Sequence, residues 1–249
     1  MPGKKNTDGY GAEMLAAYKT PGHAVPEIVE RSDGLIDFAR TGPARYFSGP
    51  EEWSKRERQA IKLARGRVLD IGAGAGRFPL YLQDRGYDVT AIDNSPGAIK
   101  VCRLRGVKNA MVRSIAEIGK FKAGSFDTIL MMGNNFGLFG NPKRAKRLLR
   151  QMFRITTEQG QIIAEATDPY QTSEPVHVQY LKANRSRGRM SGQLRLRIRH
   201  KDVVGAWFDY LFVSQNEMEM ILEGTGWEIK KVFRDQGPSY TTVIAKIYM

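Results

Sequence analysis

The chain has 249 residues, a formal net charge of +13 and 41% apolar residues. This length accommodates one elaborated α/β domain or two small domains, and the apolar share suffices for a packed core. No stretch approaches the ~20 apolar residues of a membrane span. The polar N-terminus, Met1 to Thr7, lacks the apolar block of a secretory signal, and the single cysteine, Cys102, allows no intrachain disulfide. We therefore expect a cytoplasmic protein.

The positive charge is concentrated in two stretches, residues 143–150 and 182–201. Such charge is a hint of an anionic partner, such as nucleic acid, a membrane surface or an acidic metabolite. Charge runs are more often solvated faces, so the charge alone does not select a partner.

The N-terminal part and the middle of the chain have different patterns. The first fifty residues predict one or two short helices, around Gly9 to Tyr18 and Pro26 to Arg31. Pro50 opens a further helix that runs to about Ala64. Strands then alternate with helices: strands are predicted at 67–71, 87–92, 109–113, 126–132 and 161–165, and helices at 78–85, from Ser95-Pro96, and at 142–155. This alternation predicts an α/β fold with a mainly parallel sheet.

The alternation stops near Asp168. Residues 176–213 follow period two, with Leu194, Leu196 and Ile198 between arginines, which predicts two or three antiparallel strands. Ser214 then caps a helix through about Glu223, and two final strands follow at 227–234 and 240–247.

A glycine-rich turn follows the first strand of the α/β part. Gly72, Gly74 and Gly76 let the backbone approach a ligand, and helix N-terminal N–H groups favour electron-rich groups. Asp93 ends the second strand, where an acid can bind ribose hydroxyls. This arrangement fits NAD or S-adenosylmethionine. The even glycine spacing, which departs from G-x-G-x-x-G, and Asp70 before the turn favour S-adenosylmethionine.

At this point the sequence resembles the class I S-adenosylmethionine-dependent methyltransferases. The resemblance rests on residues 68–76, on Ala91-Ile92-Asp93, on residues 113–117, where Ser114 replaces a frequent Asp, and on residues 125–132. The last two strands also resemble the terminal hairpin of that family. The resemblance implies a Rossmann-like, mainly parallel seven-stranded sheet with helices on both faces, and a small antiparallel insertion after the fifth strand.

The resemblance also implies which residues bind the cofactor. They are Asp70, Gly72, Ala73, Gly74, Gly76, Asp93, Asn94, Ser114, Ile115, Ala116, Gly133 and Asn134. It divides the chain into a helical cap (1–64), a cofactor-binding domain (65–167 and 214–249) and inserted strands that cover the acceptor site (168–213).

The methyl acceptor is expected beyond the carboxyl ends of the strands. The loop from Gly133 to Gly140 resembles that of glycine N-methyltransferase-like enzymes, which act on small amines, although Phe136 and Phe139 fit a core role better. His177 and Tyr180 are candidates to accept or orient a proton from the acceptor. The row of Arg195, Arg197 and Arg199 is either an anion site or, for most of its members, a solvent-facing row. No group of residues has metal-ligand spacing.

These patterns predict a methyltransferase that transfers a methyl group in line to a small or medium-sized acceptor. Three alternatives remain. An RNA-modifying methyltransferase would explain the basic surface, but the Asp/Asn-Pro-Pro-Tyr/Phe turn of many base-amine methyltransferases is missing after the fourth strand. A catalytically silent cofactor-binding protein would share the same motifs. An NAD-dependent oxidoreductase is disfavoured by Arg77 and by Asp70.

Overall fold

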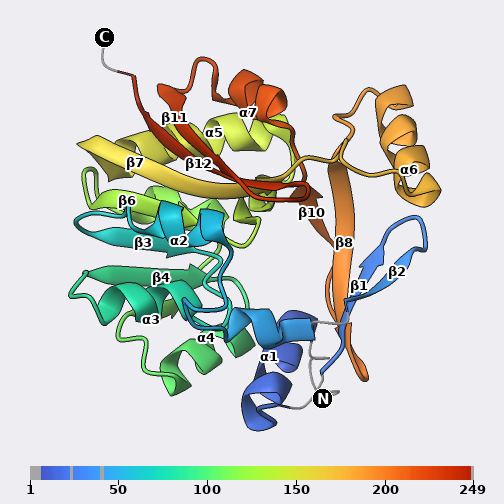
Figure 1. Ribbon diagram of the computed structural model, residues 1–249, viewed down its shortest axis with the longest axis horizontal. Coiled ribbons are helices and arrows are strands. Elements are labelled where there is room, and N and C mark those ends of the chain that lie inside the picture. Colours follow the sequence, from blue (N-terminus) through green and yellow to red (C-terminus); the bar gives the residue numbers. More distant parts are fainter. Residues whose placement is uncertain (1–6, 23–24, 40–41, 248–249) are drawn as a thin grey trace.

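The computed structural model describes residues 7–22, 25–39 and 42–247. Within them, seven strands form the larger sheet in the order β11-β12-β7-β6-β3-β4-β5 (Figure 1). These strands are β3 (Val68–Ile71), β4 (Val89–Asp93), β5 (Ala110–Val112), β6 (Phe126–Met131), β7 (Thr156–Thr167), β11 (Trp227–Arg234) and β12 (Ser239–Lys246). Strands β3 to β7 pair in parallel, whereas β12 runs antiparallel to β7 and β11. The predicted Rossmann-like sheet is confirmed.

Helices cover both faces of this sheet. One face carries α2 (Lys55–Ile61), α3 (Arg77–Gln83) and α4 (Pro96–Leu104), and the other carries α5 (Pro142–Ile155) and α7 (Gln215–Leu222). Adjacent strand residues serve opposite faces, since Val68 packs with α2 and α3 whereas Leu69 packs with α5 and α7. Burial on both faces explains why these strands are almost continuously apolar.

Local capping sets the start of several helices. The Ser95 hydroxyl accepts the Ala98 N–H at 3.0 Å, with Pro96 in the first turn of α4, and Ser214 caps α7. Both caps were predicted. The helix expected from Pro50 begins only at Lys55, because Ser54 and Glu57 form a capping box there and the residues before it are turns.

A second, antiparallel sheet stands beside the first. It has the order β10-β8-β1-β2, with β9 paired to β8. Its strands are β1 (Glu27–Arg31), β2 (Ile36–Ala39), β8 (Gln193–His200), β9 (Val203–Val204) and β10 (Phe208–Leu211). In Figure 1 the long strand β8 crosses the view at right angles to the larger sheet, with the β1–β2 hairpin at its side. The second sheet therefore joins the N-terminal part to the inserted part.

Two secondary-structure predictions for these parts are wrong. Residues 26–31 were expected to be helical, but Glu27–Arg31 is strand β1, whose residues from Ile28 to Arg31 pair with residues 196–199 of β8. A partner strand so distant in sequence is invisible to a local pattern. The start of the 176–213 segment was expected to be a strand but is helix α6 (Pro175–Ser186), which opens with a proline at its first position.

The expected helical cap over residues 1–64 is consequently a mixed region. It contains α1 (Gly9–Lys19), which was predicted, the β1–β2 hairpin and the 3-10 turn η1 (Gly42–Tyr46). The 3-10 turns η2 (Ile115–Lys120) and η3 (Asn135–Phe139) follow β5 and β6 in the larger sheet. The targeting prediction rested on Met1 to Thr7, of which residues 1–6 lie outside the described residues. Across the described ranges, no helix is both long and apolar enough to cross a bilayer.

Candidate active site

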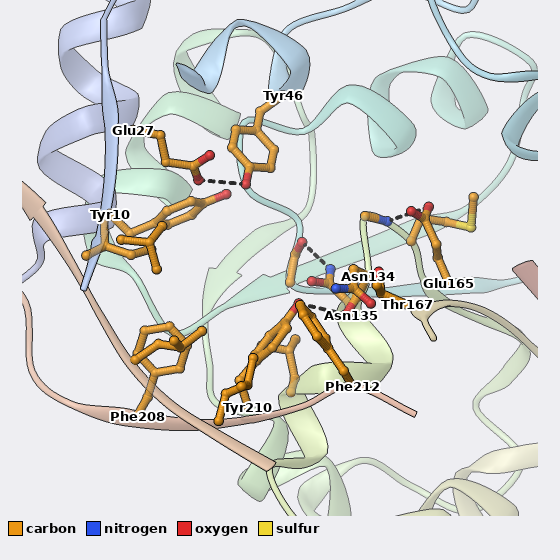
Figure 2. A pocket seen from close by; sticks show the side chains of 18 of the residues that line it. Tyr10, Glu27, Tyr46, Asn134, Asn135, Glu165, Thr167, Phe208, Tyr210 and Phe212 are labelled. Atoms are coloured by element: carbon orange, nitrogen blue, oxygen red, sulfur yellow. Dashed lines mark hydrogen bonds between the residues drawn. The ribbon is translucent and has the colours of Figure 1, made fainter. Parts of the chain in front are cut away.

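A cavity of about 1530 Å³ lies between the two sheets. Its walls come from α1, from β1 and η1, from the turns after β3, β4 and β6, from α6, and from β8 and β10. Figure 2 shows side chains from α1, β1, η1, the loop after β6 and β10 around one space. The carboxyl ends of the parallel strands thus face the antiparallel sheet across the cavity, which is where ligands of open α/β sheets bind.

The glycine turn after β3 is held against the end of β4. The N–H groups of Gly72 and Ala73 donate to the Ile92 carbonyl oxygen at 2.9 and 3.1 Å. Gly72 and Gly74 have φ of +78° and +56°, which side chains rarely adopt. A Cβ on Gly72 would lie 2.5 Å from Asn135 Nδ2, and one on Gly74 would lie 2.8 Å from the Tyr10 hydroxyl. Only glycine fits these two positions of the turn.

Asp93 lies at the cavity and also organises the turn. Its carboxylate oxygens accept the N–H groups of Gly74 at 3.0 Å and Ser95 at 2.9 Å. Burial raises the pKa of this carboxyl to about 6, while the two N–H groups oppose the rise. Each carboxylate oxygen has a second acceptor position. Asp93 is therefore placed to bind a ligand's hydroxyl groups while it holds the turn in shape.

The other predicted cofactor residues divide into two groups. Those that line the cavity, besides Gly72 and Asp93, are Asn94, Ser114, Ile115, Gly133 and Asn134. Those absent from its lining are Asp70, Ala73, Gly74, Gly76 and Ala116. Asp70 is 2% exposed within β3, where burial first and the charge of Asp93 second raise its pKa to about 7. Gly76 serves packing, because its Cβ would lie 2.8 Å from Val107.

The loop after β6 presents an unusual asparagine to the cavity. Asn134 has φ of +67°, and its side-chain Oδ1 is buried without a hydrogen-bond partner. The Tyr210 hydroxyl fixes the loop by donating to the Asn134 carbonyl oxygen at 2.6 Å, and Asn135 Nδ2 donates to the Ile71 and Gly72 carbonyls at 2.9 Å. A strained residue with an orphaned acceptor is typical of a ligand-binding position.

The two phenylalanines of this loop belong to the core, as predicted. Phe136 and Phe139 are both fully buried, and their rings meet edge to face with centroids 4.9 Å apart. Neither phenylalanine lines the cavity, whereas Asn134 and Leu138 of the same loop do.

Beneath this loop lies a buried network of ion pairs that no local sequence pattern indicates. Arg56 pairs with Glu165 at 3.0 Å, and Arg77 pairs with Glu57 at 2.7 Å. Glu165 also accepts the Gly133 N–H at 3.1 Å. Burial raises the pKa of Glu165, against the influence of Arg56. Through the hydrogen bond from Gly133 to Glu165, this network holds the backbone of the loop after β6 in place.

His177 and Tyr180 line the cavity from helix α6 rather than from a loop. Arg31 Nη1 lies 2.9 Å from His177 Nδ1, and its guanidinium stacks 4.1 Å from the centre of the Tyr180 ring. Because a guanidinium is only a donor, Nδ1 of His177 is the acceptor and its proton resides on Nε2. Neither ring nitrogen then has a free lone pair, so this geometry disfavours His177 as a base. Asp33 completes the group by pairing with Arg31 at 2.7 Å.

The antiparallel sheet gives the cavity an apolar wall. Its lining side chains on β8, β10 and the adjoining segments are Leu194, Leu196, Ile198, Trp207, Phe208, Tyr210 and Phe212. The alternate arginines are not members of this wall: Arg197 and Arg199 pair with Glu30, and Arg195 pairs with Asp209. The possible anion site on this arginine row is therefore wrong, because carboxylates of the neighbouring strands already pair with it.

The N-terminal part supplies cavity residues for which the sequence carried no signal. They are Tyr10 on α1, Glu27 on β1 and Tyr46 on η1. The rings of Tyr10 and Tyr46 meet edge to face with centroids 5.7 Å apart, and the Tyr46 hydroxyl donates to Glu27 at 3.0 Å. Single residues in unrelated local patterns meet here only because β1 joins the second sheet. The described residues contain no group of three or more His, Cys, Asp or Glu placed to hold a metal.

Comparisons with known proteins agree with this geometry. Residues 69–164 match a family described as "Methyltransferase domain". Over 210 residues the chain is 29% identical to the demethylmenaquinone methyltransferase of Renibacterium salmoninarum, and the match covers 81% of each chain. It is 36% identical over 77 residues to a ubiquinone biosynthesis O-methyltransferase of Xanthomonas oryzae, covering 29% of this chain but only 32% of that relative.

A solved structure extends the likeness to the whole chain. An S-adenosylmethionine-dependent methyltransferase from Bacteroides fragilis, in complex with S-adenosyl-L-homocysteine, superposes with a TM-score of 0.81 and 26% identity. The match covers 97% of this chain and 96% of that one. The fold and the site define a class I S-adenosylmethionine-dependent methyltransferase. This chain is an S-adenosylmethionine-dependent methyltransferase, and S-adenosylmethionine is its cofactor.

The residues present fit this cofactor. The backbone of the glycine turn reaches the cavity at Gly72, beside Asn94 and Asp93 at the end of β4. Asp93 offers acceptor positions suited to ribose hydroxyls, and Asn134 Oδ1 is an acceptor that awaits a donor. When bound, the cofactor supplies an electrophilic methyl group on a sulfonium.

Proposed function

We propose that the enzyme methylates a small, flat aromatic acceptor that carries a ring hydroxyl, such as a quinol or a catechol. The main supporting observation is the apolar wall of the second sheet, whose Phe208, Tyr210 and Phe212 line the same cavity as Gly72 of the glycine turn (Figure 2). Flat aromatic rings stack on such side chains, with about 0.5–1.5 kcal/mol per ring pair beyond the area buried. Two relatives are named a demethylmenaquinone methyltransferase and a ubiquinone biosynthesis O-methyltransferase, which agrees with this class of acceptor.

We propose the following roles for the cavity residues. Asp93 binds the ribose hydroxyls, Gly72 lies at the methionyl part, and Ser114 and Ile115 lie at the adenine. Asn134 lies where cofactor and acceptor meet, because its Oδ1 is unpaired and Tyr210 fixes its backbone. The chain's contribution is alignment of the acceptor, which can supply several kcal/mol without a covalent intermediate.

The division into parts follows from these roles. We propose that residues 65–167 and 214–249 form the cofactor-binding part, and that residues 1–64 and 168–213 together form the acceptor-binding cover. The cover combines two parts of the chain, since β1 pairs with β8. A cytoplasmic location belongs to the same proposal, because the one cysteine, Cys102, allows no intrachain disulfide.

The alternative of an RNA acceptor has no comparable support. The arginines of β8 are paired with Glu30 and Asp209, and the wall that faces the cofactor turn is apolar. Arg31, which lines the cavity from β1, is engaged by Asp33 and His177.

The test is methyl transfer from S-adenosylmethionine to a panel of purified acceptors, followed by mass spectrometry. The panel contains catechol, a naphthoquinol, an aliphatic amine and total RNA. We expect methylated products from the ring hydroxyl compounds. Transfer to RNA or to the aliphatic amine alone would overturn the proposal.

A further inference from the structure

A buried carboxylate, Glu27, projects into the cavity from the start of β1. Glu27, Val29 and Arg31 alternate along β1 and all line the cavity, so the strand presents this face to the acceptor space. Glu27 is 3% exposed. A charged side chain at such a position costs free energy unless it is paired.

Two donors from η1 hold this carboxylate. The Tyr46 hydroxyl donates to Glu27 Oε1 at 3.0 Å, and Arg45 Nη2 donates to Oε2 at 3.0 Å. Arg45 Nη2 also donates to the Tyr46 hydroxyl at 2.7 Å. An ionised carboxylate has about four acceptor positions, and these contacts use two of them. The carboxylate is therefore stabilised and oriented, and it retains acceptor positions.

Glu27 lies between the cofactor turn and the aromatic wall, which is the part of the apolar wall formed by Phe208, Tyr210 and Phe212. A Cβ on Gly74 would lie 3.8 Å from Tyr46 Cδ1, so the ring that holds Glu27 also borders the turn. In Figure 2, Glu27 and Tyr46 lie across the drawn space from Phe208 and Tyr210. A ring stacked on that wall has Glu27 on its other side, toward the cofactor.

The neighbouring titratable groups leave Glu27 as the group suited to accept a proton. Those that face it are Tyr10 and Glu13 from α1, Arg45 and Tyr46 from η1, and Tyr210 from β10. Burial, followed by the charge of Glu27, raises the pKa of Glu13 to about 9, so Glu13 keeps its proton at neutral pH. Burial raises the pKa values of the three tyrosines as well.

The other buried carboxylates at the cavity are engaged elsewhere. Glu165 uses Oε1 for Arg56 and Oε2 for the Gly133 N–H, and Figure 2 places it beyond Asn134 from Glu27. Glu57 pairs with Arg77. His177, the sequence-based candidate, is bound by Arg31 through Nδ1.

We propose that Glu27 is the general base that accepts the proton of the acceptor's ring hydroxyl, a role that rests on the proposed function. The O–H bond breaks and its proton goes to a Glu27 carboxylate oxygen. The electron pair left on the acceptor oxygen forms the bond to the methyl carbon as the carbon–sulfur bond breaks, and that pair stays on sulfur. Tyr46 and Arg45 are positioning residues in this step.

The first test compares Glu27→Gln with the wild type on two probes, catechol and 4-nitrocatechol. A general base contributes roughly 10²–10⁴-fold when the proton must be removed. Glu27→Gln should lose about 100-fold or more in kcat with catechol. It should lose less than about 10-fold with 4-nitrocatechol, whose acidic hydroxyl is already ionised near neutral pH. Glu27→Asp should recover part of the catechol rate.

The matched control is Glu30→Gln on the same strand. Glu30 alternates with the cavity-facing residues and pairs with Arg197 and Arg199. We expect its turnover to stay within about 2-fold of the wild type, a change below about 0.5 kcal/mol. Calorimetry with S-adenosylhomocysteine should give the same affinity for Glu27→Gln as for the wild type, which shows that the variant is folded.

A second readout does not depend on turnover. The ionisation of 4-nitrocatechol bound to the S-adenosylhomocysteine complex can be followed by its absorbance as the pH is raised. A nearby carboxylate disfavours a second negative charge. The bound probe should therefore ionise at a higher pH in the wild type than in Glu27→Gln, and Glu30→Gln should match the wild type.

The outcomes separate the two proposals. Equal losses on both probes, or an unchanged ionisation pH of the bound probe, would overturn the role of Glu27 while wild-type transfer to catechol upholds the proposed function. Failure of the wild type to methylate any ring hydroxyl compound of the panel would overturn the proposed function, and the role of Glu27 with it.

Discussion

The two sheets of the enzyme bury their side chains in different ways. Every residue of β3 is buried, as are all but one in β6, because helices cover both faces of the larger sheet. In β8 a single residue, His200, is buried, and β10 likewise buries only Leu211. The second sheet has the cavity on one face and ion pairs such as Glu30–Arg197 on the other.

This difference separates two tasks. Closely packed interiors respond strongly to any change in volume, so the larger sheet holds the cofactor turn rigidly. Side chains on the cavity face of the second sheet border the cavity on one side. Substitutions there should change the shape of the acceptor space with little loss of folding stability. The comparison therefore predicts that cofactor binding and acceptor binding can be damaged separately.

Among the changes that test this comparison, the largest effect on binding is expected on the cofactor side. Asp93→Ala removes the carboxylate that holds the Gly74 and Ser95 N–H groups and, in our proposal, the ribose. Loss of a charge-assisted hydrogen bond of roughly 1.5–3 kcal/mol should weaken S-adenosylhomocysteine binding about 10- to 100-fold in calorimetry. Asp88→Ala, just before the other end of β4, is the control and should bind normally. An unchanged affinity in Asp93→Ala would remove Asp93 from the cofactor site.

A smaller effect is expected on the acceptor side. Phe208→Ala removes one ring of the aromatic wall and should raise the KM for catechol about 2- to 10-fold through the loss of ring stacking. Affinity for S-adenosylhomocysteine should stay the same. Phe38→Ala is the control, since Phe38 is 61% exposed on β2. If Phe208→Ala weakened cofactor binding as much as acceptor binding, the two sheets would not act separately.

A third expected effect concerns stability and leaves binding unchanged. Asp70 has its pKa raised from 3.8 to about 7 by burial and by Asp93, so the folded state retains a proton that the unfolded chain releases above pH 4. Its contribution to stability therefore falls as the pH rises from about 4 to about 7. Asp70→Asn cannot ionise, so its stability relative to the wild type should increase across this window.

The measurement is the melting temperature of both proteins at pH 5 and pH 8. One pKa unit corresponds to about 1.4 kcal/mol, and about 1 kcal/mol shifts the melting temperature of a chain of this size by roughly 2–4 °C. The difference in melting temperature between Asp70→Asn and the wild type should be greater at pH 8 than at pH 5, by at least roughly 2–4 °C. Asp88→Asn, at an exposed position, should show no such dependence. The same advantage at both pH values would mean that Asp70 does not hold a proton at neutral pH.

Much of the cofactor half could be read from short stretches of sequence. Helix α5 and strand β11 were predicted with the bounds that the structure has, and Ser95 and Ser214 were identified as caps. Each of these features depends on residues a few positions apart. The acceptor half was predicted less well: residues 26–31 were taken for a helix, and α6 for a strand.

The same contrast holds for individual side chains. The sequence singled out His177 because histidine is a common base, but it could not show that Arg31 donates to its Nδ1. Arg195, Arg197 and Arg199 were recognised as a row, but their partners Glu30 and Asp209 lie on other strands. Glu27 was missed altogether, since nothing in its local sequence distinguishes it from a surface residue.

The sequence by itself determined the α/β fold, the glycine turn with Asp93 and the choice of cofactor, because these depend on periodicity and on residues close together in the chain. The tertiary structure alone decided the acceptor cavity. Strand β1 pairs with β8 across most of the chain, and this pairing brings Glu27 and the aromatic wall to the two sides of one space. Long-range pairing is set by the burial and hydrogen bonding of the whole fold, which a local pattern does not contain.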